Sequence, residues 1–281
     1  MLLRIAVGDA YGAGFEYTDP AFVAQHNTLA GYVAHPRHKI GSGRYTDDTQ
    51  MSIAVAETLL LGGLTARHFA DAFVGAFKRD PREGYAGGFY KFLCSVANGE
   101  DFIQRIVPKS DKSGAAMRAV PLGVLPTVER VREVCTVQAK LTHDTADGIA
   151  AAVAASLAAH YFLYGLGTKA DLGTFLDREV PGRKWSEPFK GKVGEKGWES
   201  VQAALTALAA HDSMSAILQA CVAFTGDVDT VAAVALGVAA LCPEVKQDLP
   251  QVLVDGLENG AYGRDYLVEL NARLLALVKR K

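Results

Sequence analysis

The sequence predicts an all-α fold that forms a single domain. Apolar residues recur mostly at helical spacing along the chain. The same stretches are rich in Ala and Leu, which favour helix, and Ala lets neighbouring helices approach closely. Alternation with a period of two residues is rare, and clusters of β-branched residues are sparse. No linker composition and no internal repeat is present, so we expect one domain over residues 1–281.

Seven segments carry this helical pattern and are expected to form the main helices. They span residues 51–61, 69–77, 149–163, 201–208, 216–224, 231–241 and 266–278. The longest irregular segments cover about 17–48 and 178–198, and irregular segments of this length in a compact domain are often functional. The basic tail at 278–281 is expected to be a solvated helix end whose charges suit the helix dipole.

The charge balance and the cysteines exclude several classes of protein. The chain has 281 residues, with 29 Lys and Arg against 31 Asp and Glu, and this near-neutral balance argues against nucleic-acid binding. The four cysteines form no C-x-x-C pair, which argues against a thiolate zinc site. No run reaches the roughly 18 apolar residues that span a bilayer. We therefore expect a soluble, cytoplasmic monomer with no membrane or nucleic-acid partner.

Two short acidic clusters each lead directly into an apolar helical segment. The first is Thr46-Asp47-Asp48, before the segment 51–61, and the second is Asp227-Val228-Asp229-Thr230, before the segment 231–241. One interpretation is N-capping, because Asp and Thr are good caps and a helix N-terminus favours negative charge. One acid per helix would satisfy that need, however, and two adjacent acids repel each other unless a cation lies between them.

A hard divalent cation would relieve this repulsion. Mg²⁺ and Mn²⁺ prefer oxygen ligands such as carboxylates, hydroxyls and water. If the two acidic clusters face each other, they supply six side-chain oxygen groups, enough for two ions with water completing the coordination. The spacing alone leaves both interpretations open, capping and metal binding.

Four weaker signals accompany the acidic clusters. A run of small residues from Gly8 ends at Glu16, which is either a solvated end of close helix packing or a ligand or base over a site. A hydroxyl-rich turn at 109–118 could cradle phosphate with its backbone N–H groups, although most such turns are only turns. Thr142-His143-Asp144 resembles a helix start and, less commonly, the His-Asp pair of metal-dependent phosphohydrolases. Tyr85, Phe89 and Tyr90, beside a group of glycines, fit either a core corner or an aromatic wall.

Taken in order, these segments resemble the ADP-ribosylglycohydrolase family, which includes the dinitrogenase-reductase-activating glycohydrolases. The resemblance runs from about residue 5 to the C-terminus. Its specific part is the two acidic clusters together, each opening an Ala-rich helix. The segments that carry it are Gly8-Asp9-Ala10-Tyr11-Gly12, Tyr45-Thr46-Asp47-Asp48-Thr49, Gly84-Tyr85, Gly114-Ala115-Ala116-Met117-Arg118, Thr142-His143 and Gly226-Asp227-Val228-Asp229-Thr230.

The resemblance implies a compact, single-domain orthogonal helix bundle whose central cleft holds a dinuclear metal site with two Mg²⁺ or Mn²⁺ ions. Carried over residue by residue, the metal ligands are Thr46, Asp47, Asp48, Asp227, Asp229 and Thr230. The catalytic candidates are Glu16, Asp47 and Asp48, and the substrate-binding candidates are Gly84, Tyr85, Ser110, Ser113, Gly114 and His143. The implied ligand is ADP-ribose, or a protein or small molecule that carries it.

Two departures from the family pattern bear on the site. Members usually carry Gly-Gly-Asp-Thr-Asp-Thr in the second acidic cluster, whereas Thr225 and Val228 stand here. The ligating residues are kept, so metal binding is expected to persist. Members also often carry Gly-Asn-Gly before Ala-Met-Arg, whereas Lys112-Ser113-Gly114 takes that place. Lys109 or Lys112 could replace the lost amide with positive charge, which leaves the phosphate geometry and the substrate open.

The resemblance implies hydrolysis of the glycosidic bond at C1″ of an ADP-ribosylated substrate. The segments near Glu16 and Thr46 favour ADP-ribosyl-arginine, while a serine-linked bond and O-acetyl-ADP-ribose stay open. One alternative is a catalytically silent ADP-ribose-binding or structural relative on the same scaffold, as in the lens crystallins of this family. Another is a metal phosphohydrolase that uses His143 and Asp144, although the other histidines form no second motif.

Overall fold

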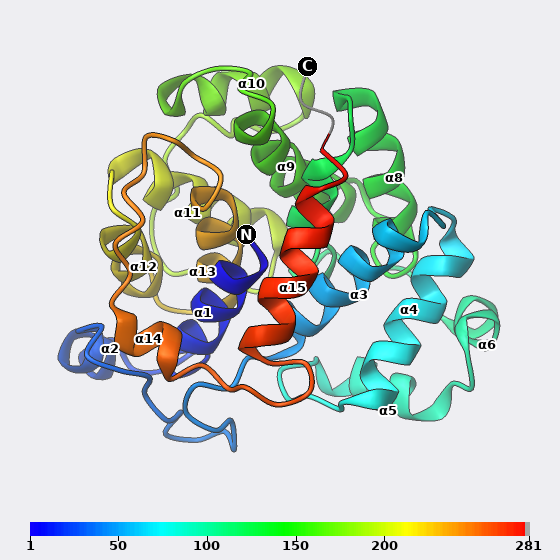
Figure 1. Cartoon of the computed structure of the whole chain (residues 1–281), viewed down its shortest axis with the longest axis horizontal. Coiled ribbons are helices and arrows are strands. Elements are labelled where there is room, and N and C mark those ends of the chain that lie inside the picture. The colour runs from blue at the N-terminus through cyan, green and yellow to red at the C-terminus, as the bar shows by residue number, and fades with distance from the viewer. Residues whose placement is uncertain (279–281) are drawn as a thin grey trace.

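The computed structural model describes residues 1–278, and every regular element in them is helical (Figure 1). Two long helices lie at the centre, α1 (Leu2–Ala13) and α13 (Val228–Ala239), beside α3 (Asp47–Leu61) and α9 (Ala146–Leu163). Only isolated β-bridges join the loops in this part of the chain. The predicted all-α class is confirmed.

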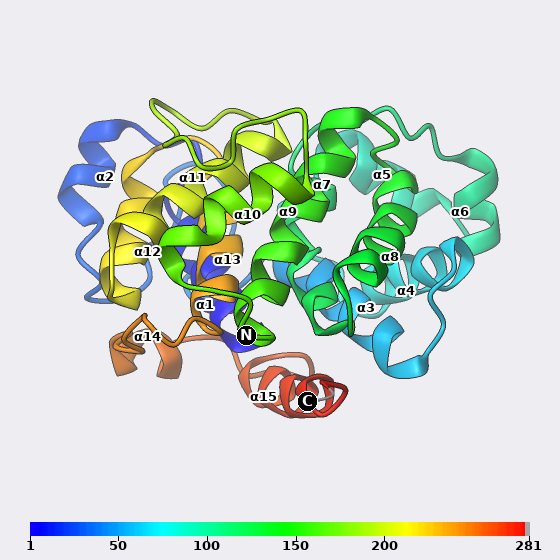
Figure 2. The ribbon, with the colours of Figure 1, turned by 90° about the horizontal axis from the view of Figure 1, so that it is seen from above.

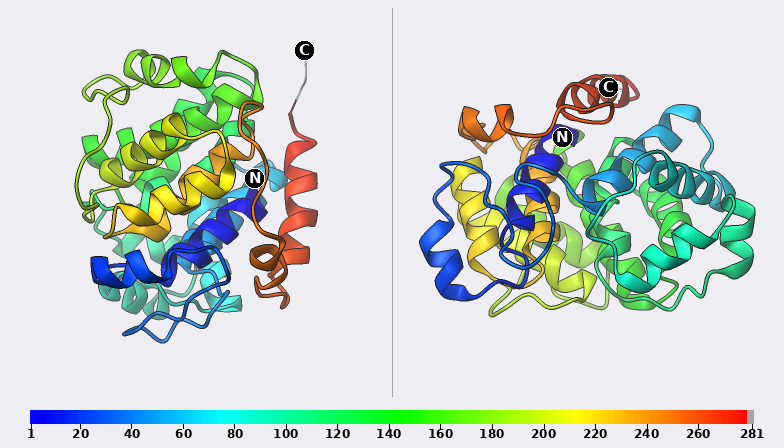
Figure 3. Two further views of the ribbon diagram at one scale, coloured as in Figure 1. Left: turned by 90° about the vertical axis from the view of Figure 1, so that its left-hand side faces the viewer. Right: turned by 90° about the horizontal axis from the view of Figure 1, so that it is seen from below.

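The remaining helices surround this centre in two groups. In Figure 2, α2, α11 and α12 lie on one side of α1 and α13, and α4, α5, α6 and α8 lie on the other. Figure 3 shows α14 and α15 together on one face. Their bounds are α2 Pro20–His26, α4 Ala66–Arg79, α5 Gly87–Ser95, α6 Gly99–Arg105, α7 Gly114–Met117, α8 Val128–Lys140, α10 Leu172–Glu179, α11 Gly197–Ala210, α12 Met214–Ala223, α14 Gln251–Asp255 and α15 Arg264–Leu275, with 3₁₀ helices η1 Val120–Val124 and η2 Lys169–Asp171.

All seven predicted helical segments lie in helices, with ends that differ by a few residues. The segment 231–241 ends at Ala239 in the structure, and 51–61 begins earlier, at Asp47. The segment at 17–48 is not wholly irregular, because it contains α2, which starts with Asp19 as cap and Pro20 in its first turn. The prediction for the basic tail concerns residues 278–281, and all of its charged residues, at 279–281, lie outside the described residues.

The core helix α9 is long and apolar enough, by length and composition, to cross a membrane. Its 18 residues have a mean hydropathy of 1.4, and 72% of them are buried inside the molecule. Asp147, Ser156 and His160 interrupt the helix, so no unbroken apolar run of 18 residues is present in it, although the mean hydropathy of the whole helix stays high. Burial on most sides is typical of the central helix of a globular fold.

Close packing of α1 against α13 holds the centre together. Gly8 faces the backbone of α13, where a Cβ atom would lie 2.4 Å from the carbonyl oxygen of Ala232. Gly12 faces the start of α13, where a Cβ would lie 2.5 Å from the Cα of Asp229. The small-residue run from Gly8 therefore packs two helix backbones together, as the close-packing part of its first interpretation expects.

The substitution Gly8→Ala tests this contact. A methyl group at this position must push α1 away from α13, so we expect the free energy of unfolding to fall by about 1–3 kcal/mol. The control is Gly75→Ala on the exposed side of α4, where nothing lies within 4 Å of the added Cβ. That control should gain up to about 1 kcal/mol from helix propensity. Urea unfolding of both variants measures the difference, and equal effects would contradict the close contact.

Candidate active site

The first acidic cluster lies at the N-terminus of α3 and is held by its own cap. Thr46 precedes the helix, and its hydroxyl accepts a hydrogen bond from the backbone N–H of Asp48 at 3.4 Å. Asp47 and Asp48 stand in the first turn and are buried. Gly84 lies against Asp47 with a φ of +107°, and a Cβ there would be 2.1 Å from the Asp47 Oδ1. Gly84 therefore lets the chain pass directly beside the Asp47 carboxylate.

A carboxylate that sequence reasoning gave no role organises this cluster. Asp9, on α1, is fully buried and accepts hydrogen bonds from the backbone N–H groups of Thr46 and Thr49, at 3.0 Å each. The hydroxyls of the same two residues donate to it at 2.8 and 2.5 Å. Asp9 thus ties the first turn of α3 to α1. The small residues around it gave no signal of this role, because the partner threonines are distant in sequence.

The second acidic cluster lies at the start of α13. Asp227 occupies the N-cap position and Asp229 the first turn, and both are buried. The Ser200 hydroxyl of α11 donates to Asp227 Oδ2 at 3.1 Å. The backbone N–H of Tyr17 donates to the Gly226 carbonyl oxygen at 2.9 Å, which joins this turn to the turn after α1.

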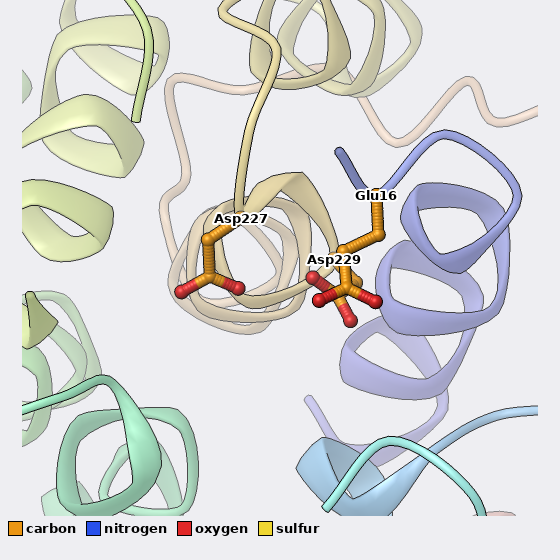
Figure 4. A group of neighbouring side chains, drawn as sticks. All are labelled: Glu16, Asp227 and Asp229. Atoms are coloured by element: carbon orange, nitrogen blue, oxygen red, sulfur yellow. The ribbon is translucent and has the colours of Figure 1, made fainter. Parts of the chain in front are cut away.

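The turn after α1 places Glu16 beside the second acidic cluster. Figure 4 shows Glu16 reaching from the end of α1 to the two acids at the start of α13. Carboxylate oxygens of Glu16, Asp227 and Asp229 all lie within 4.8 Å of one another. Of the two interpretations of Glu16, the structure favours a place in the site over a solvated end.

Both acidic clusters open onto one cavity of about 650 Å³. Eleven of the thirteen predicted site residues line it: Glu16, Asp47, Asp48, Gly84, Ser110, Ser113, Gly114, His143, Asp227, Asp229 and Thr230. Two do not. Thr46 is fully buried and its hydroxyl binds Asp9, while the Tyr85 hydroxyl donates to Gln50 Oε1 at 2.7 Å within the core. The cavity is also lined by residues that were given no place in the predicted site, Tyr17, Phe89, Phe92, Arg105, Arg118 and Glu195.

This site belongs to a chain whose whole length, residues 1–281, matches the family model described as ADP-ribosylglycohydrolase. The chain belongs to the ADP-ribosylglycohydrolase family. A solved structure titled "ADP-ribosylglycohydrolase-related protein complex" shares its fold, with a TM-score of 0.76 and 22% identity over 99% of this chain and 95% of that one.

Two curated relatives carry names within the same family. The chain is 27% identical over 249 residues to the ADP-ribosyl-[dinitrogen reductase] glycohydrolase of Rhodospirillum rubrum, a match that covers 83% of this chain and 81% of that protein. It is 28% identical over 209 residues to the ADP-ribosylhydrolase ARH3 of Xenopus tropicalis, covering 67% and 56%. The chain spans about half the length of several curated relatives that it matches, including 48% of the mouse ARH3.

In this member of the family, five carboxylates, those of the two acidic clusters and Glu16, line the cavity, and a sixth, Asp9, is fully buried beside the first cluster. Burial raises the pKa of these carboxyl groups most, and the neighbouring carboxylates raise it further. The pKa of Glu16 rises to about 7, and those of Asp47, Asp48 and Asp229 rise well above their ordinary value. Burial also raises the pKa of Asp9 to about 6, against the effect of its hydrogen bonds, and raises that of Asp227. Within residues 1–278, no Lys or Arg forms an ion pair with any of the six.

The donor atoms on this wall fit a hard divalent cation. The Oδ1 atoms of Asp48 and Asp229 are buried and have no hydrogen-bond partner in the described residues. Unpartnered buried carboxylate oxygens are costly unless a cation binds them. Asp47, Asp48, Asp227, Asp229 and Glu16 could therefore hold metal, with Thr230 beside them on the cavity wall.

The His-Asp interpretation is wrong for this chain. His143 lines the cavity, but Asp144 is exposed, does not line it and forms an ion pair with Lys140 at 3.6 Å. The pair therefore does not act together at one site, as a phosphohydrolase would need.

Thr225, one of the two departures from the family pattern, has an unusual backbone conformation. Its φ is +61°, the left-handed region that β-branched residues rarely adopt. The chain needs this conformation because the loop beside it pairs closely here: Val193 N–H donates to the Thr225 carbonyl at 3.0 Å. The Gly that family members usually carry at this position would avoid the strain.

The substitution Thr225→Asn should relieve this strain. Asn tolerates the left-handed region better than Thr, so we expect the free energy of unfolding to rise by about 1 kcal/mol. The matched control is Thr174→Asn on the exposed side of α10, where Thr and Asn have similar helix propensity and little change is expected. Thermal unfolding of both variants measures the effect, and a loss of stability at 225 would contradict the explanation.

The raised carboxyl pKa values predict that the contribution of these groups to stability without divalent cations falls as pH rises. In the unfolded chain, Asp and Glu have their ordinary pKa values of 3.8 and 4.5. From those values up to about pH 7, the folded chain therefore keeps protons that the unfolded chain has released. The lowered pKa values of His143 and of the N-terminal amine act in the opposite direction, so a difference between variants isolates the carboxylate contribution. In urea unfolding with a chelator, the gain in stability from Asp229→Asn over the wild-type protein should be larger at pH 8 than at pH 5, and Asp144→Asn, an exposed control, should show no such trend. A gain that shrinks over this range would be the contrary result.

Proposed function

We propose that this protein is a metal-dependent hydrolase that cleaves the C1″ glycosidic bond of ADP-ribosylated substrates and releases ADP-ribose. One observation carries the proposal: two acidic clusters from distant parts of the chain and Glu16 converge on one wall of a single cavity. Membership of the ADP-ribosylglycohydrolase family supports the reaction class. The volume of about 650 Å³ is within the range of sites that enclose a small-molecule ligand.

The acidic wall is the proposed site of two Mg²⁺ or Mn²⁺ ions, held by Asp47, Asp48, Asp227, Asp229 and Thr230. A bound divalent ion lowers the pKa of its water and orients substrate oxygens. We withdraw Thr46 as a direct ligand, because its hydroxyl is already committed to Asp9 and does not line the cavity.

The rest of the cavity is the proposed binding surface for ADP-ribose. Ser110, Ser113, Gly114 and His143 lie on one part of it, and Gly84 lies beside the acidic wall. Phe89 and Phe92 add an apolar surface on which a base could pack. Tyr85 does not line the cavity but supports this surface from behind, because its ring packs against Phe89 with the ring centroids 5.9 Å apart, and its hydroxyl is bonded to Gln50.

The same wall suits the chemistry of ribosyl transfer to water. Cleavage at C1″ develops positive charge on the ribose ring, and fixed anions stabilise that charge. Glu16, Asp47 and Asp48 are the candidates for the acid or base that exchanges a proton with the attacking water, because each of them lines the cavity.

ADP-ribosyl-arginine is the linkage that we propose first. The chain covers 81% of the Rhodospirillum rubrum glycohydrolase but only 56% of the Xenopus ARH3, which supports kinship with the bacterial type. A silent binding relative is the alternative, and the complete set of buried carboxylates argues against it.

A panel of arginine-, serine- and acetyl-linked ADP-ribose substrates tests the proposal. We expect free ADP-ribose from the arginine-linked substrate with Mn²⁺ or Mg²⁺ present, and none in a chelator. Asp47→Ala and Asp227→Ala should each reduce turnover by about a thousandfold or more, since each removes transition-state stabilisation.

Asp144→Ala is the control for that experiment, because Asp144 is exposed and outside the cavity; it should keep wild-type turnover. Tight binding of ADP-ribose without metal and without release from any substrate would establish the silent binder instead.

A further inference from the structure

The cavity lining also contains a buried cation, Arg118, that does not balance the charge of the acids. Arg118 is 1% exposed, forms no ion pair with a carboxylate in the described chain and stacks over Phe73 at 4.4 Å. Its Nε donates to Gln138 Oε1 at 2.6 Å, and its Nη2 donates to Thr142 Oγ1 at 2.8 Å. Burying a guanidinium is costly, and the proposed function assigns Arg118 no role.

Gln138 fixes the orientation of this guanidinium. It is fully buried, and its amide Nε2 donates to the Ala115 carbonyl oxygen at 3.2 Å. The amide oxygen must therefore face Arg118, which also donates from Nη2 to the Gln138 carbonyl oxygen at 3.2 Å. Arg118 is held on one edge and presents an N–H to Thr142.

The contact with Arg118 determines where the Thr142 hydroxyl proton goes. A guanidinium can only donate, so Thr142 Oγ1 accepts from Arg118. The other close partner of Oγ1 is Nδ1 of His143, at 2.6 Å. If His143 donated from Nδ1, the hydroxyl would accept twice and its own proton would have no partner among residues 1–278. The arrangement that pairs the Arg118 N–H, the hydroxyl proton and Nδ1 has the hydroxyl donating to Nδ1, which leaves the ring proton on Nε2.

The Nε2 edge of His143 is the edge without a protein partner. Nε2 is buried and makes no hydrogen bond within the described residues, while His143 lines the cavity. The ring fits against Gly114, where a Cβ would lie 3.1 Å from its Cε1. Burial, first, and Arg118, second, lower the pKa of His143 to about 3, so the ring is neutral and carries one proton.

We propose that Arg118 and Thr142 are positioning residues that fix His143 as the Nε2–H tautomer, so that it donates a hydrogen bond to an acceptor oxygen of the bound ligand. The second half of this proposal rests on the proposed function, because ADP-ribose is the ligand considered. A ligand oxygen at Nε2 would also pair a buried N–H that otherwise has no acceptor. A ligand N–H or other donor at the same place would bind more weakly, because it would leave two donors facing each other.

The tautomer can be measured without any ligand. Nitrogen-15 magnetic resonance of the histidine rings in the wild-type protein should show His143 with its proton on Nε2, assigned by comparison with His143→Gln. In Thr142→Val, which keeps the shape but removes the hydroxyl, Nδ1 should no longer be held as an acceptor and the Nδ1–H form should become populated. Thr142→Ser keeps the hydroxyl and should restore the wild-type ring spectrum.

Binding of ADP-ribose in the presence of Mg²⁺, measured by calorimetry, gives the second readout. We expect the Kd to rise about tenfold in Thr142→Val and to stay within about threefold of wild type in Thr142→Ser, since one oriented hydrogen bond is lost and then restored. Circular dichroism of each variant checks the fold, and the wild-type spectrum tests the tautomer even if a variant unfolds.

Two outcomes would overturn the proposal: a wild-type His143 that carries its proton on Nδ1, or a Thr142→Val variant with an unchanged ring spectrum and an unchanged Kd. Failure of the proposed function looks different. In that case ADP-ribose does not bind the wild-type protein, yet the ring spectra still follow the hydroxyl at 142, which supports the positioning roles of Arg118 and Thr142.

Discussion

The crowding of six carboxylates, five buried and one, Glu16, half-buried, is the constraint on which the rest of this structure depends. Burial raises the pKa of these groups most, and the neighbouring like charges raise it further, as Glu16 and Asp229 illustrate. A chain that only had to fold would place such groups on its surface. The fold instead gathers them from α1, α3 and α13, and the packing of those helices must resist the separation that the charges favour.

Backbone contacts supply that resistance more than ion pairs do. The glycines of α1 let its backbone meet α13, so the second acidic cluster and Glu16 are placed by two helices in direct contact. Asp9 reaches from the same helix to cap α3, and its four hydrogen bonds fix the first acidic cluster. Helix N-termini also favour nearby negative charge by about 0.3–1 kcal/mol each, which lowers the cost of both clusters.

The sequence predicted the parts of this arrangement whose chemistry is local. Each acidic cluster precedes an apolar helix, and the repulsion between its two acids indicated that a cation or another part of the chain must face it.

The sequence did not predict the partners that long-range contacts supply. Thr46 looked like a ligand because its hydroxyl is adjacent to the acids, and only the fold reveals that Asp9 takes that hydroxyl. Tyr85 looked like a cavity residue because it follows Gly84, yet its ring turns into the core toward Phe77. Arg118 appeared only as the last residue of a motif, since its partners Gln138 and Thr142 lie a full helix further along.

Charged groups are spread unevenly over the cavity lining, and this bears on how a ligand lies in it. Glu16 and the two acidic clusters gather where α1, α3 and α13 meet, while Arg105, Arg118, neutral His143 and the Lys112–Glu195 ion pair, at 2.7 Å, line the cavity as well. A molecule with anionic and uncharged hydroxyl-bearing ends places its anionic end away from the acids, because the opposite orientation would bring like charges together in a partly desolvated space. The hydroxyl-bearing end then faces the acidic wall, where bound cations would contact it. In the proposed complex, ADP-ribose carries its diphosphate between two riboses, so this polarity would keep the diphosphate away from the acids. The choice of which ribose faces the carboxylates would then fall to the packing of the base on the apolar surface of Phe89 and Phe92.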